Sequence, residues 1–180
     1  MPFEALYIPA EDSYLLAETV RSYYGKKALE IGIGSGIVTN ILCKNFDIVV
    51  GTDIHLKSVN YTKYRVPKNT LLICCNMSDP LRFGFDLIVS NPPYLPNFSA
   101  DGRRDFATDG GPTAIEWSTS FLEKSVTILK HTGQILILLS SLSDISRLDK
   151  VLGSLKLRRK GISQRKTFYE VLQVFEISKE

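Results

Sequence analysis

The chain has 180 residues, of which 44% are hydrophobic, and a formal net charge of only +3 at pH 7. A chain of this size can bury one full core, so residues 1–180 are expected to form a single domain without a separate substrate-reading unit. The weak net charge argues against nonspecific nucleic-acid binding as the main task, and the lack of a ~20-residue apolar run or a signal-peptide pattern predicts a non-membrane, cytoplasmic protein, with the nucleus as a second compartment.

Apolar periodicity predicts helices and strands in alternation. The first helix is expected over residues 11–24, with Leu16, Val20 and Tyr23 at helical spacing and Gly25 as its stop. The expected strands are residues 28–31, 48–51, 71–74, 85–89, 134–139, 155–159 and 169–177, and the further helices are residues 36–44, 56–64, 114–129 and 144–152. This order predicts right-handed βαβ units, a mostly parallel sheet and therefore an α/β fold.

Two segments differ from this pattern. Residues 95–112 show no convincing period, and loops of that length in a compact domain are usually lids, binding loops or disordered. Residues 156–166, the basic segment, contain Lys156, Arg158, Arg159, Lys160, Arg165 and Lys166 and no acidic residue. The basic segment is either a solvated hairpin or a docking patch for an acidic or RNA-containing partner.

Metal-ligating and redox-active residues are scarce. Cys43, Cys74 and Cys75 form no C-x-x-C pair, and their odd number argues against a disulfide framework. Because His55 and His131 lie far apart in sequence, no metal site is expected. We expect Cys74 and Cys75 to be small buried side chains on opposite faces of their strand.

A glycine-rich turn, Glu30-Ile31-Gly32-Ile33-Gly34-Ser35-Gly36, separates the first strand from the next helix. Glycines at this place allow a sharp turn and the close approach of a ligand. A dinucleotide fingerprint needs glycine or alanine where the chain has Ile37, whereas Asp53 ends the second strand at a spacing suited to ribose hydroxyls. Glu30 suits a cation better than a pyrophosphate. The pattern favours a ligand made of adenosine and a cation over NAD, and a tight turn capped by Asp53 is the structural alternative.

A rigid polar corner, Ser90-Asn91-Pro92-Pro93-Tyr94, follows the strand at residues 85–89. Proline cannot donate to a sheet ladder and fixes its own φ, so the strand ends here and its last residues are held in place. A rigid turn without chemistry is the alternative to a binding corner.

Together the glycine-rich turn, Asp53 and the Asn91-Pro92-Pro93-Tyr94 motif resemble the class I S-adenosylmethionine-dependent methyltransferases. The chain is most similar to their short HemK-type branch, the eukaryotic and archaeal release-factor glutamine methyltransferases. Its opening segment Pro9-Ala10-Glu11-Asp12-Ser13-Tyr14-Leu15-Leu16 is similar to the P-A-E-D-[ST]-x-L-L signature of that branch, and the Gly110-Gly111 pair extends the resemblance. The resemblance implies a Rossmann-like domain with a seven-stranded, mostly parallel sheet, helices on both faces and an antiparallel last strand.

The resemblance also implies a reaction and its residues. The cofactor would be S-adenosyl-L-methionine, and the substrate would be the glutamine amide in the Gly-Gly-Gln loop of a translation termination factor. Asn91, Pro92, Pro93 and Tyr94 would be catalytic. The cofactor would be bound by Glu11, Asp12, Ser13, Glu30, Gly32, Gly34, Gly36, Asp53, Ile54, Asn76, Met77 and Asn91.

Some of these assignments leave alternatives open. Asn76 stands where the family usually has an acidic residue that accepts from the adenine amino group, and an amide oxygen accepts more weakly. Asn76 is otherwise a plain turn residue, and Asp79 is a substitute acceptor. Asp12 or Ser13 can instead supply the cap of the first helix.

The polar corner suggests a mechanism. A glutamine amide is a poor nucleophile because its nitrogen lone pair is delocalised, so the nitrogen must be aimed at the methyl group. The side-chain oxygen of Asn91 and the backbone oxygen of Pro92 can each accept one amide N–H, which favours the charge that develops on nitrogen. Tyr94 is expected to pack its ring beside the amide or the methyl donor.

The expected third strand, residues 70–75, is apolar on both faces and lies at a sheet edge in the order that the resemblance implies. Such an edge is an aggregation hazard unless it is covered, and a partner that adds a strand can cover it. The resemblance implies a small zinc-binding activator protein in this role; cover by the chain's own helices and loop is the alternative. Other functions considered are an adenine N6-methyltransferase of DNA or RNA, a protein lysine methyltransferase and an adenosine-binding scaffold, and no direct nucleic-acid substrate is expected.

Overall fold

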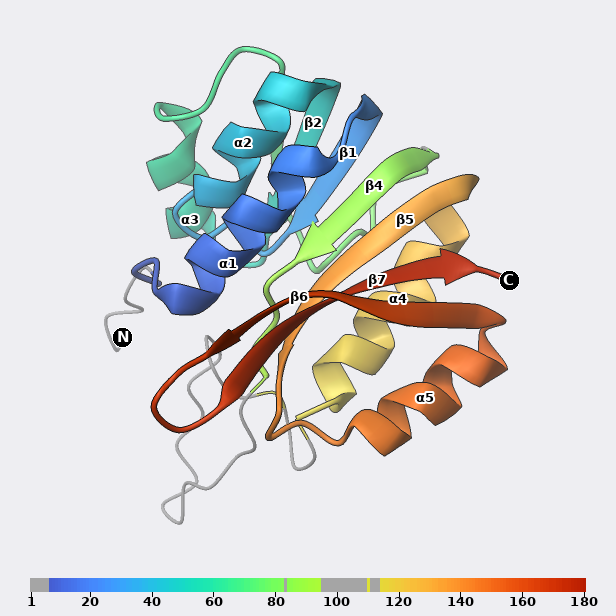
Figure 1. Ribbon diagram of the computed structural model, residues 1–180. Coiled ribbons are helices and arrows are strands. Elements are labelled where there is room, and N and C mark those ends of the chain that lie inside the picture. Colours follow the sequence, from blue (N-terminus) through green and yellow to red (C-terminus); the bar gives the residue numbers. More distant parts are fainter. Residues whose placement is uncertain (1–6, 83, 95–109, 111–113) are drawn as a thin grey trace.

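The computed structural model describes residues 7–82, 84–94, 110 and 114–180. Its seven strands are β1 (Gly25–Ile31), β2 (Phe46–Asp53), β3 (Thr70–Cys74), β4 (Phe85–Ser90), β5 (Leu129–Ser140), β6 (Leu157–Lys166) and β7 (Val171–Lys179). They form one sheet in the order β3-β2-β1-β4-β5-β7-β6 (Figure 1). Strands β1 to β5 pair in parallel, and β7 is antiparallel to both β5 and β6. The expected seven-stranded, mostly parallel sheet with an antiparallel last strand is therefore confirmed.

Helices cover both faces of the sheet. The helices are α1 (Glu11–Thr19), the 3-10 turn η1 (Val20–Ser22), α2 (Ile37–Asn45), α3 (Leu56–Lys63), α4 (Glu116–Ile128) and α5 (Ile145–Ser154). One core packs α4 and α5 on the sheet through residues such as Phe121 and Leu148, and a second core packs α1 and α2 on the opposite face through Leu16 and Leu42. The expected two-faced α/β architecture is thus present.

Alternating side chains along the central strands supply both cores. In β1, Ala28 belongs to the core under α1 and α2, whereas Leu29 and Ile31 belong to the core under α4 and α5. Successive side chains of a strand point to opposite faces, so Glu30 lies on the same face as Ala28. A buried carboxyl is thereby placed beside α2, at the end of β1.

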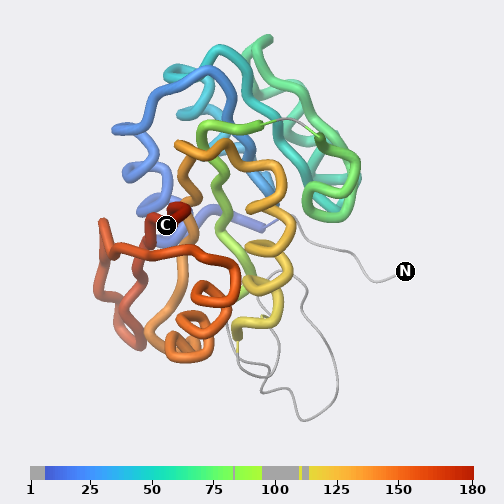
Figure 2. The backbone as a smooth tube through the Cα atoms, turned by 90° about the vertical axis from the view of Figure 1, so that its right-hand side faces the viewer, coloured from blue at the N-terminus to red at the C-terminus, as the bar shows by residue number. Residues whose placement is uncertain are grey.

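The order in which successive strands are added to the sheet reverses between β1 and β4. Strands β2 and β3 lie on the β1 side of this boundary and strands β5 to β7 lie on the β4 side, as both views of the backbone show (Figures 1 and 2), whereas α1 contacts α2 and also β6 and β7. In open α/β sheets, ligands bind beyond the carboxyl ends of the strands at such a switch point. The glycine-rich turn after β1 and the polar corner after β4 both lie there, because Ile31 and Ser90 are paired at the ends of the two strands.

Several details differ from the sequence predictions. The first helix ends at Thr19 rather than at residue 24, and Gly25, expected as its stop, begins β1. Strand β5 begins at Leu129 rather than at residue 134. The backbone of Ala10 begins α1 without any side-chain cap, so neither Asp12 nor Ser13 caps the helix. Strand β6 runs to Lys166 rather than ending at residue 159, so the basic segment lies almost entirely on this strand. Cys74 is exposed, so its expected burial is wrong; β3 is an edge strand and has no further strand beside it.

The described residues contain neither a candidate membrane-spanning helix nor a candidate metal-binding cluster. None of the helices in that part of the chain has the length and apolarity that a membrane crossing needs. The same residues contain no group of three or more His, Cys, Asp or Glu side chains that could hold a metal ion.

The expected loop at residues 95–112 lies outside the described residues except for Gly110, where an added Cβ would come 2.6 Å from the carbonyl oxygen of Pro93. This position therefore packs directly against the polar corner.

Candidate active site

The glycine-rich turn is open to a ligand at two positions. Gly32, Gly34 and Gly36 have φ values of +81°, +47° and +80°, in the left-handed region that favours glycine. No atom lies within 4 Å of the place that a Cβ would take at Gly32 or Gly34, whereas at Gly36 it would meet the methyl group of Thr62 at 2.6 Å. The first two glycines therefore present bare backbone, and the third allows α3 to pack closely.

Glu30 is a buried carboxyl behind this turn. It is 5% exposed and accepts a short hydrogen bond from the hydroxyl of Thr39 on α2. Burial raises the pKa of Glu30 to about 8, with a further increase from the charge of Asp53 and an opposing decrease from the Thr39 hydrogen bonds. Near neutral pH the carboxyl is mostly protonated, and a neighbouring cation would favour its ionised form.

Asp53 joins the glycine-rich turn to the end of β2. Its Oδ2 accepts from the backbone N–H of Gly34 at 3.0 Å, and its Oδ1 accepts from the backbone N–H of His55 at 2.9 Å. Both interactions hold the turn, as the structural alternative predicted. Each carboxylate oxygen retains a second lone pair, so Asp53 can still accept from a ligand hydroxyl.

The polar corner is held against the end of β1. The hydroxyl of Ser90 donates to the backbone oxygen of Ile31 at 2.7 Å, and Pro92 is buried. The side-chain Nδ2 of Asn91 donates to Asp12 Oδ2 at 2.9 Å, while Asn91 Oδ1 is buried and has no hydrogen-bond partner among the described residues. A buried acceptor without a donor costs free energy, and such an atom calls for an explanation.

Asp12 connects the N-terminal segment to the corner. It is 3% exposed, and its Oδ2 also accepts from the hydroxyls of Tyr7 at 2.7 Å and Tyr94 at 3.2 Å. Its Oδ1 accepts from the backbone N–H of Ser13 at 2.6 Å. Burial, together with the negative charges of Asp12 and Glu170, raises the pKa of both tyrosines well above its ordinary value. Both hydroxyls therefore stay protonated and act as donors.

The side chain of Glu11 does not share the hydrogen-bond partners of its neighbour Asp12. Both Glu11 and Glu18 accept from the guanidinium of Arg165 on β6, at 2.7 and 2.8 Å. These exposed ion pairs connect α1 to the basic segment. Arg159 of the same segment pairs with Asp149 on α5, so part of the basic charge is neutralised within the chain.

The remaining candidates line the loops after β2 and β3. Ile54 is 63% exposed, Asn76 is exposed, and Met77 is half-buried with a φ of +52°. The backbone oxygen of Asn76 accepts from the N–H of Asp79, which places it at the start of a turn. Asp79, the other acceptor considered for an adenine amino group, pairs with Lys124.

Sequence reasoning missed three residues of the site. Tyr7 and Glu170 lie beside Asp12 and Tyr94, and Thr39 donates to Glu30. Thr39 carried a usable signal, because a polar residue on the buried face of a predicted helix needs a partner. Tyr7 and Glu170 are far apart in sequence and only the tertiary structure brings them together.

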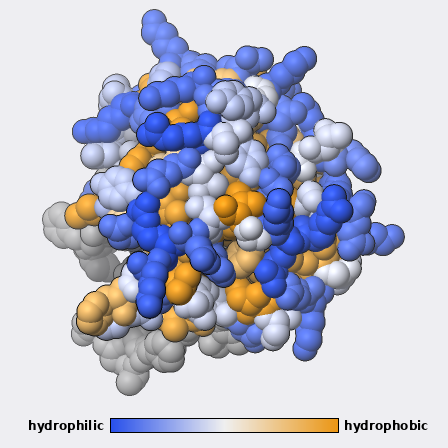
Figure 3. All heavy atoms as spheres, in the orientation of Figure 1, coloured by the Kyte–Doolittle hydropathy of each residue, from blue (hydrophilic) through white to orange (hydrophobic). Residues whose placement is uncertain are grey.

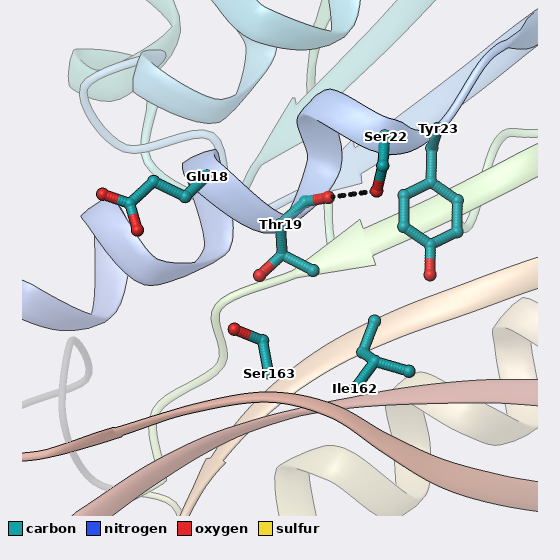
Figure 4. Close-up of a pocket in the computed structure, with 6 residues that line it drawn as sticks. All are labelled: Glu18, Thr19, Ser22, Tyr23, Ile162 and Ser163. Carbon is teal, nitrogen blue, oxygen red and sulfur yellow. Dashed lines mark hydrogen bonds between the residues drawn. The ribbon is translucent and has the colours of Figure 1, made fainter.

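A surface pocket of about 290 Å³ lies between the first helical segment and β6. It is lined by Glu18, Thr19, Ser22, Tyr23, Ile162 and Ser163, and the labelled side chains approach it from two sides (Figure 4). None of them belongs to the glycine-rich turn or the polar corner, so this pocket is separate from the candidate site.

Comparison with known proteins identifies the family. The family described as "Methyltransferase small domain" matches residues 11–169. The chain belongs to this methyltransferase family. It is 36% identical over 146 residues to a putative protein N5-glutamine methyltransferase of Methanocaldococcus jannaschii, covering 77% of this chain and 74% of that protein.

A more distant relative and a solved structure of the same fold extend the comparison. A release factor glutamine methyltransferase of Bradyrhizobium diazoefficiens is 28% identical over 162 residues, which cover 76% of this chain and only 54% of that longer protein. Among solved structures, the fold matches the E. cuniculi Mtq2-Trm112 complex, described as responsible for methylation of the eRF1 translation termination factor. The TM-score is 0.75 at 23% identity, and the match covers 97% of this chain and 98% of that chain. The Rossmann-like methyltransferase fold expected from the sequence is confirmed.

Proposed function

We propose that this methyltransferase transfers a methyl group from S-adenosyl-L-methionine to the side-chain nitrogen of the glutamine in the Gly-Gly-Gln loop of a translation termination factor. The observation that carries the proposal is Asn91 Oδ1, a buried acceptor with no donor among the described residues, at the switch point beside the glycine-rich turn. A primary amide has two N–H donors and can supply what this oxygen lacks. A glutamine substrate agrees with the M. jannaschii relative, a putative protein N5-glutamine methyltransferase, and with the B. diazoefficiens relative, a release factor glutamine methyltransferase.

The residues around the turn fit the proposed cofactor. Gly32 and Gly34 leave their backbone open for the close approach of a ligand, and the spare lone pairs of Asp53 suit ribose hydroxyls. The buried Glu30 lies at the end of β1, just before the glycine-rich turn, and its carboxyl ionises more readily when a cation is near. Ile54, Asn76 and Met77 follow β2 and β3 at the same end of the sheet, where an adenine ring would lie.

The cofactor supplies an electrophilic methyl group on sulfur, and the protein orients the nucleophile. Asn91 Oδ1 and the backbone oxygen of Pro92 each accept one N–H of the substrate amide, which directs its nitrogen at the methyl carbon. Both acceptors favour the positive charge that develops on nitrogen as the new N–C bond forms and the S–C bond breaks. An N-protonated amide is a strong acid, so it loses its extra proton to water and no strong base is needed. Pro93 and Tyr94 keep the corner rigid.

A small zinc-binding activator protein is proposed to cover β3. The strand lies at the edge of the sheet, and not one of its side chains is buried in the described structure. Leu71 is 57% exposed, and Cys74 beside it is exposed as well. Addition of a partner strand would satisfy the free backbone groups of this edge and cover its apolar side chains.

The reaction is proposed to take place in the cytoplasm. The proposed substrate is tested with purified components. The chain, with and without a co-expressed activator, is incubated with isotope-labelled methyl donor and a termination factor, and the labelled residue is identified by mass spectrometry. We expect label on the Gly-Gly-Gln glutamine and none when that glutamine is replaced by alanine. Label on lysine, or in nucleic acid when a cell lysate replaces the purified factor, would contradict the proposed substrate.

A further inference from the structure

The hydrogen bond between Asn91 and Asp12 determines which end of the Asn91 amide is free. The two ends of an asparagine amide have nearly the same shape, but one donates and the other accepts hydrogen bonds. We propose that Asp12 is a positioning residue that orients this amide so that its oxygen faces the substrate, an inference that rests on the proposed function. Asp12 thereby sets the requirement for a substrate N–H at Asn91, while the backbone oxygen of Pro92 accepts the second N–H.

The orientation follows from the chemistry of a carboxylate. An ionised carboxylate has no proton to donate, so only the Nδ2 end of Asn91 can face it favourably. The 2.9 Å contact between Nδ2 and Asp12 Oδ2 has this arrangement, and it leaves Oδ1 as the end without a partner among the described residues. The opposite orientation would place two acceptor oxygens against each other and turn an N–H toward the substrate's own N–H groups.

The carboxylate of Asp12 is itself held from both sides. Tyr7 and Tyr94 donate to the same oxygen as Asn91, and the backbone N–H of Ser13 donates to the other oxygen at 2.6 Å. Rotation of the carboxylate would break these bonds together, and the residue is only 3% exposed, so water has little access to replace them. The Asp12 carboxylate is therefore held in one orientation, and it fixes the orientation of the Asn91 amide.

The variant Asp12→Asn changes this orientation with little change in shape. The oxygen of the introduced amide would be retained by the backbone N–H of Ser13, which requires an acceptor. Its NH2 end would then face Asn91 and donate to Oδ1 once the Asn91 amide turns round. Asn91 would present its own NH2 to the substrate, and the acceptor for the glutamine amide would be lost.

The test compares two termination factors, one with the Gly-Gly-Gln loop and one in which that glutamine is replaced by glutamate. The glutamate form lacks the two N–H donors, so the wild-type enzyme should bind it more weakly as a competitor. In Asp12→Asn we expect turnover of the glutamine form to fall about 100-fold. We also expect the preference for glutamine over glutamate in binding to fall about 10-fold or more. Affinity for the methyl donor should change by less than about 3-fold, because Asn91 and not the cofactor is reoriented.

Glu18→Gln is the matched control, because it makes the same carboxylate-to-amide change in α1. Glu18 pairs only with Arg165 among the interactions described for its side chain, so preference, turnover and methyl-donor affinity should all stay at wild-type values. Circular dichroism checks that both variants are folded. If Asp12→Asn weakens binding of both factors equally, Asp12 is only structural; if it mainly weakens methyl-donor binding, Asp12 is a cofactor ligand. Either result overturns the inference.

A second measurement does not depend on the substrate. In 15N-labelled wild-type protein, the side-chain NH2 of Asn91 should show slow exchange with water and a shift typical of a bond to a carboxylate, and both should be lost in Asp12→Asn. Asn91 signals that are the same in the two proteins would refute the orientation. Failure of the wild-type enzyme to methylate or bind any termination factor would instead refute the proposed function and leave this result intact.

Discussion

Replacement of the buried Glu30 by glutamine should remove a loss of stability that the wild-type protein suffers as the pH rises, and should weaken binding of a cation. Burial raises the pKa of Glu30 from 4.5 to about 8, whereas the unfolded chain keeps the ordinary value. Between these two pH values the folded protein holds a proton that the unfolded chain has lost. The contribution of Glu30 to stability is therefore complete below pH 4.5, falls as the pH rises, and is constant again above about pH 8.

Glutamine keeps the shape of the side chain and does not titrate in this range. At about 1.4 kcal/mol per pKa unit, Glu30→Gln should gain about 3 kcal/mol over the wild-type protein between pH 4 and pH 7 and about 5 kcal/mol by pH 9. Urea unfolding followed by circular dichroism at several pH values measures this gain as the difference between the two proteins, in which all other titrating groups cancel. Stability curves that stay parallel from pH 4 to pH 9 would refute the assigned burial of a neutral carboxyl.

The same substitution tests the cofactor side of the proposal. A cation that binds beside Glu30 favours the ionised form, so binding of the methyl donor at pH 7 should release part of a proton from the wild-type protein. Affinity should also rise between pH 6 and pH 9 as the carboxyl ionises. Calorimetry in buffers of different ionisation enthalpy measures the released proton, and Glu30→Gln should lack this release and bind the donor more weakly. Equal proton release by the two proteins would separate Glu30 from the cofactor site.

Three further predictions concern single substitutions. Asn91→Ala should leave the methyl donor bound and slow transfer by about 100-fold or more, measured by single-turnover label incorporation; wild-type turnover would contradict its role as acceptor. Asp53→Ala should weaken methyl-donor binding by roughly 1.5–3 kcal/mol in calorimetry while the fold persists, and an unchanged dissociation constant would remove Asp53 from the site. Leu71→Lys should leave the isolated chain folded, because this side chain is 57% exposed, but should prevent co-purification with the activator; retained co-purification would place the partner elsewhere.

The order of helices and strands could be predicted because the central strands are strongly patterned. The buried second halves of β1 and β5, and nearly all of β4, are short apolar runs, and the two ligand-facing turns follow β1 and β4. The starts of β1 and β5 were placed too late in the sequence because their first residues are polar and partly exposed. The end of β6 was missed because its residues are mostly polar and at least partly exposed, so they lack the alternation that marks a half-buried strand. Pairing with β7, and not local propensity, makes these residues a strand.

The positions of the site residues were predictable, but their partners were not. Asp12 and Asn91 were both selected from motifs, although they are 79 residues apart and nothing in either motif indicates that they share a hydrogen bond. Tyr7 belongs to no motif, and only its hydrogen bond to Asp12 in the folded chain places it at the site. Motifs thus identified which residues meet at the switch point, and only the tertiary structure shows which atoms remain free.

The two edges of the sheet differ in a way that bears on the partner. Edge strand β6 carries most of the basic segment, has an irregular register between Gly161 and Ser163, and is connected by Arg159 and Arg165 to α5 and α1. Charges and bulges of this kind prevent a further strand from pairing. Figure 3 shows the face with β6 as mostly hydrophilic, with apolar side chains in small groups.

Edge strand β3 has none of these features in the described structure, since it contains no charged residue and its register with β2 is regular. If the chain acted alone, both edges would need the same protection against aggregation. If a second chain pairs with β3, the protein needs this protection only at the β6 edge. Because the loops that follow β2 and β3 carry Ile54, Asn76 and Met77, a partner strand on β3 would also hold the adenine side of the proposed cofactor site in place. Stability and methyl-donor affinity should then rise together when the partner binds.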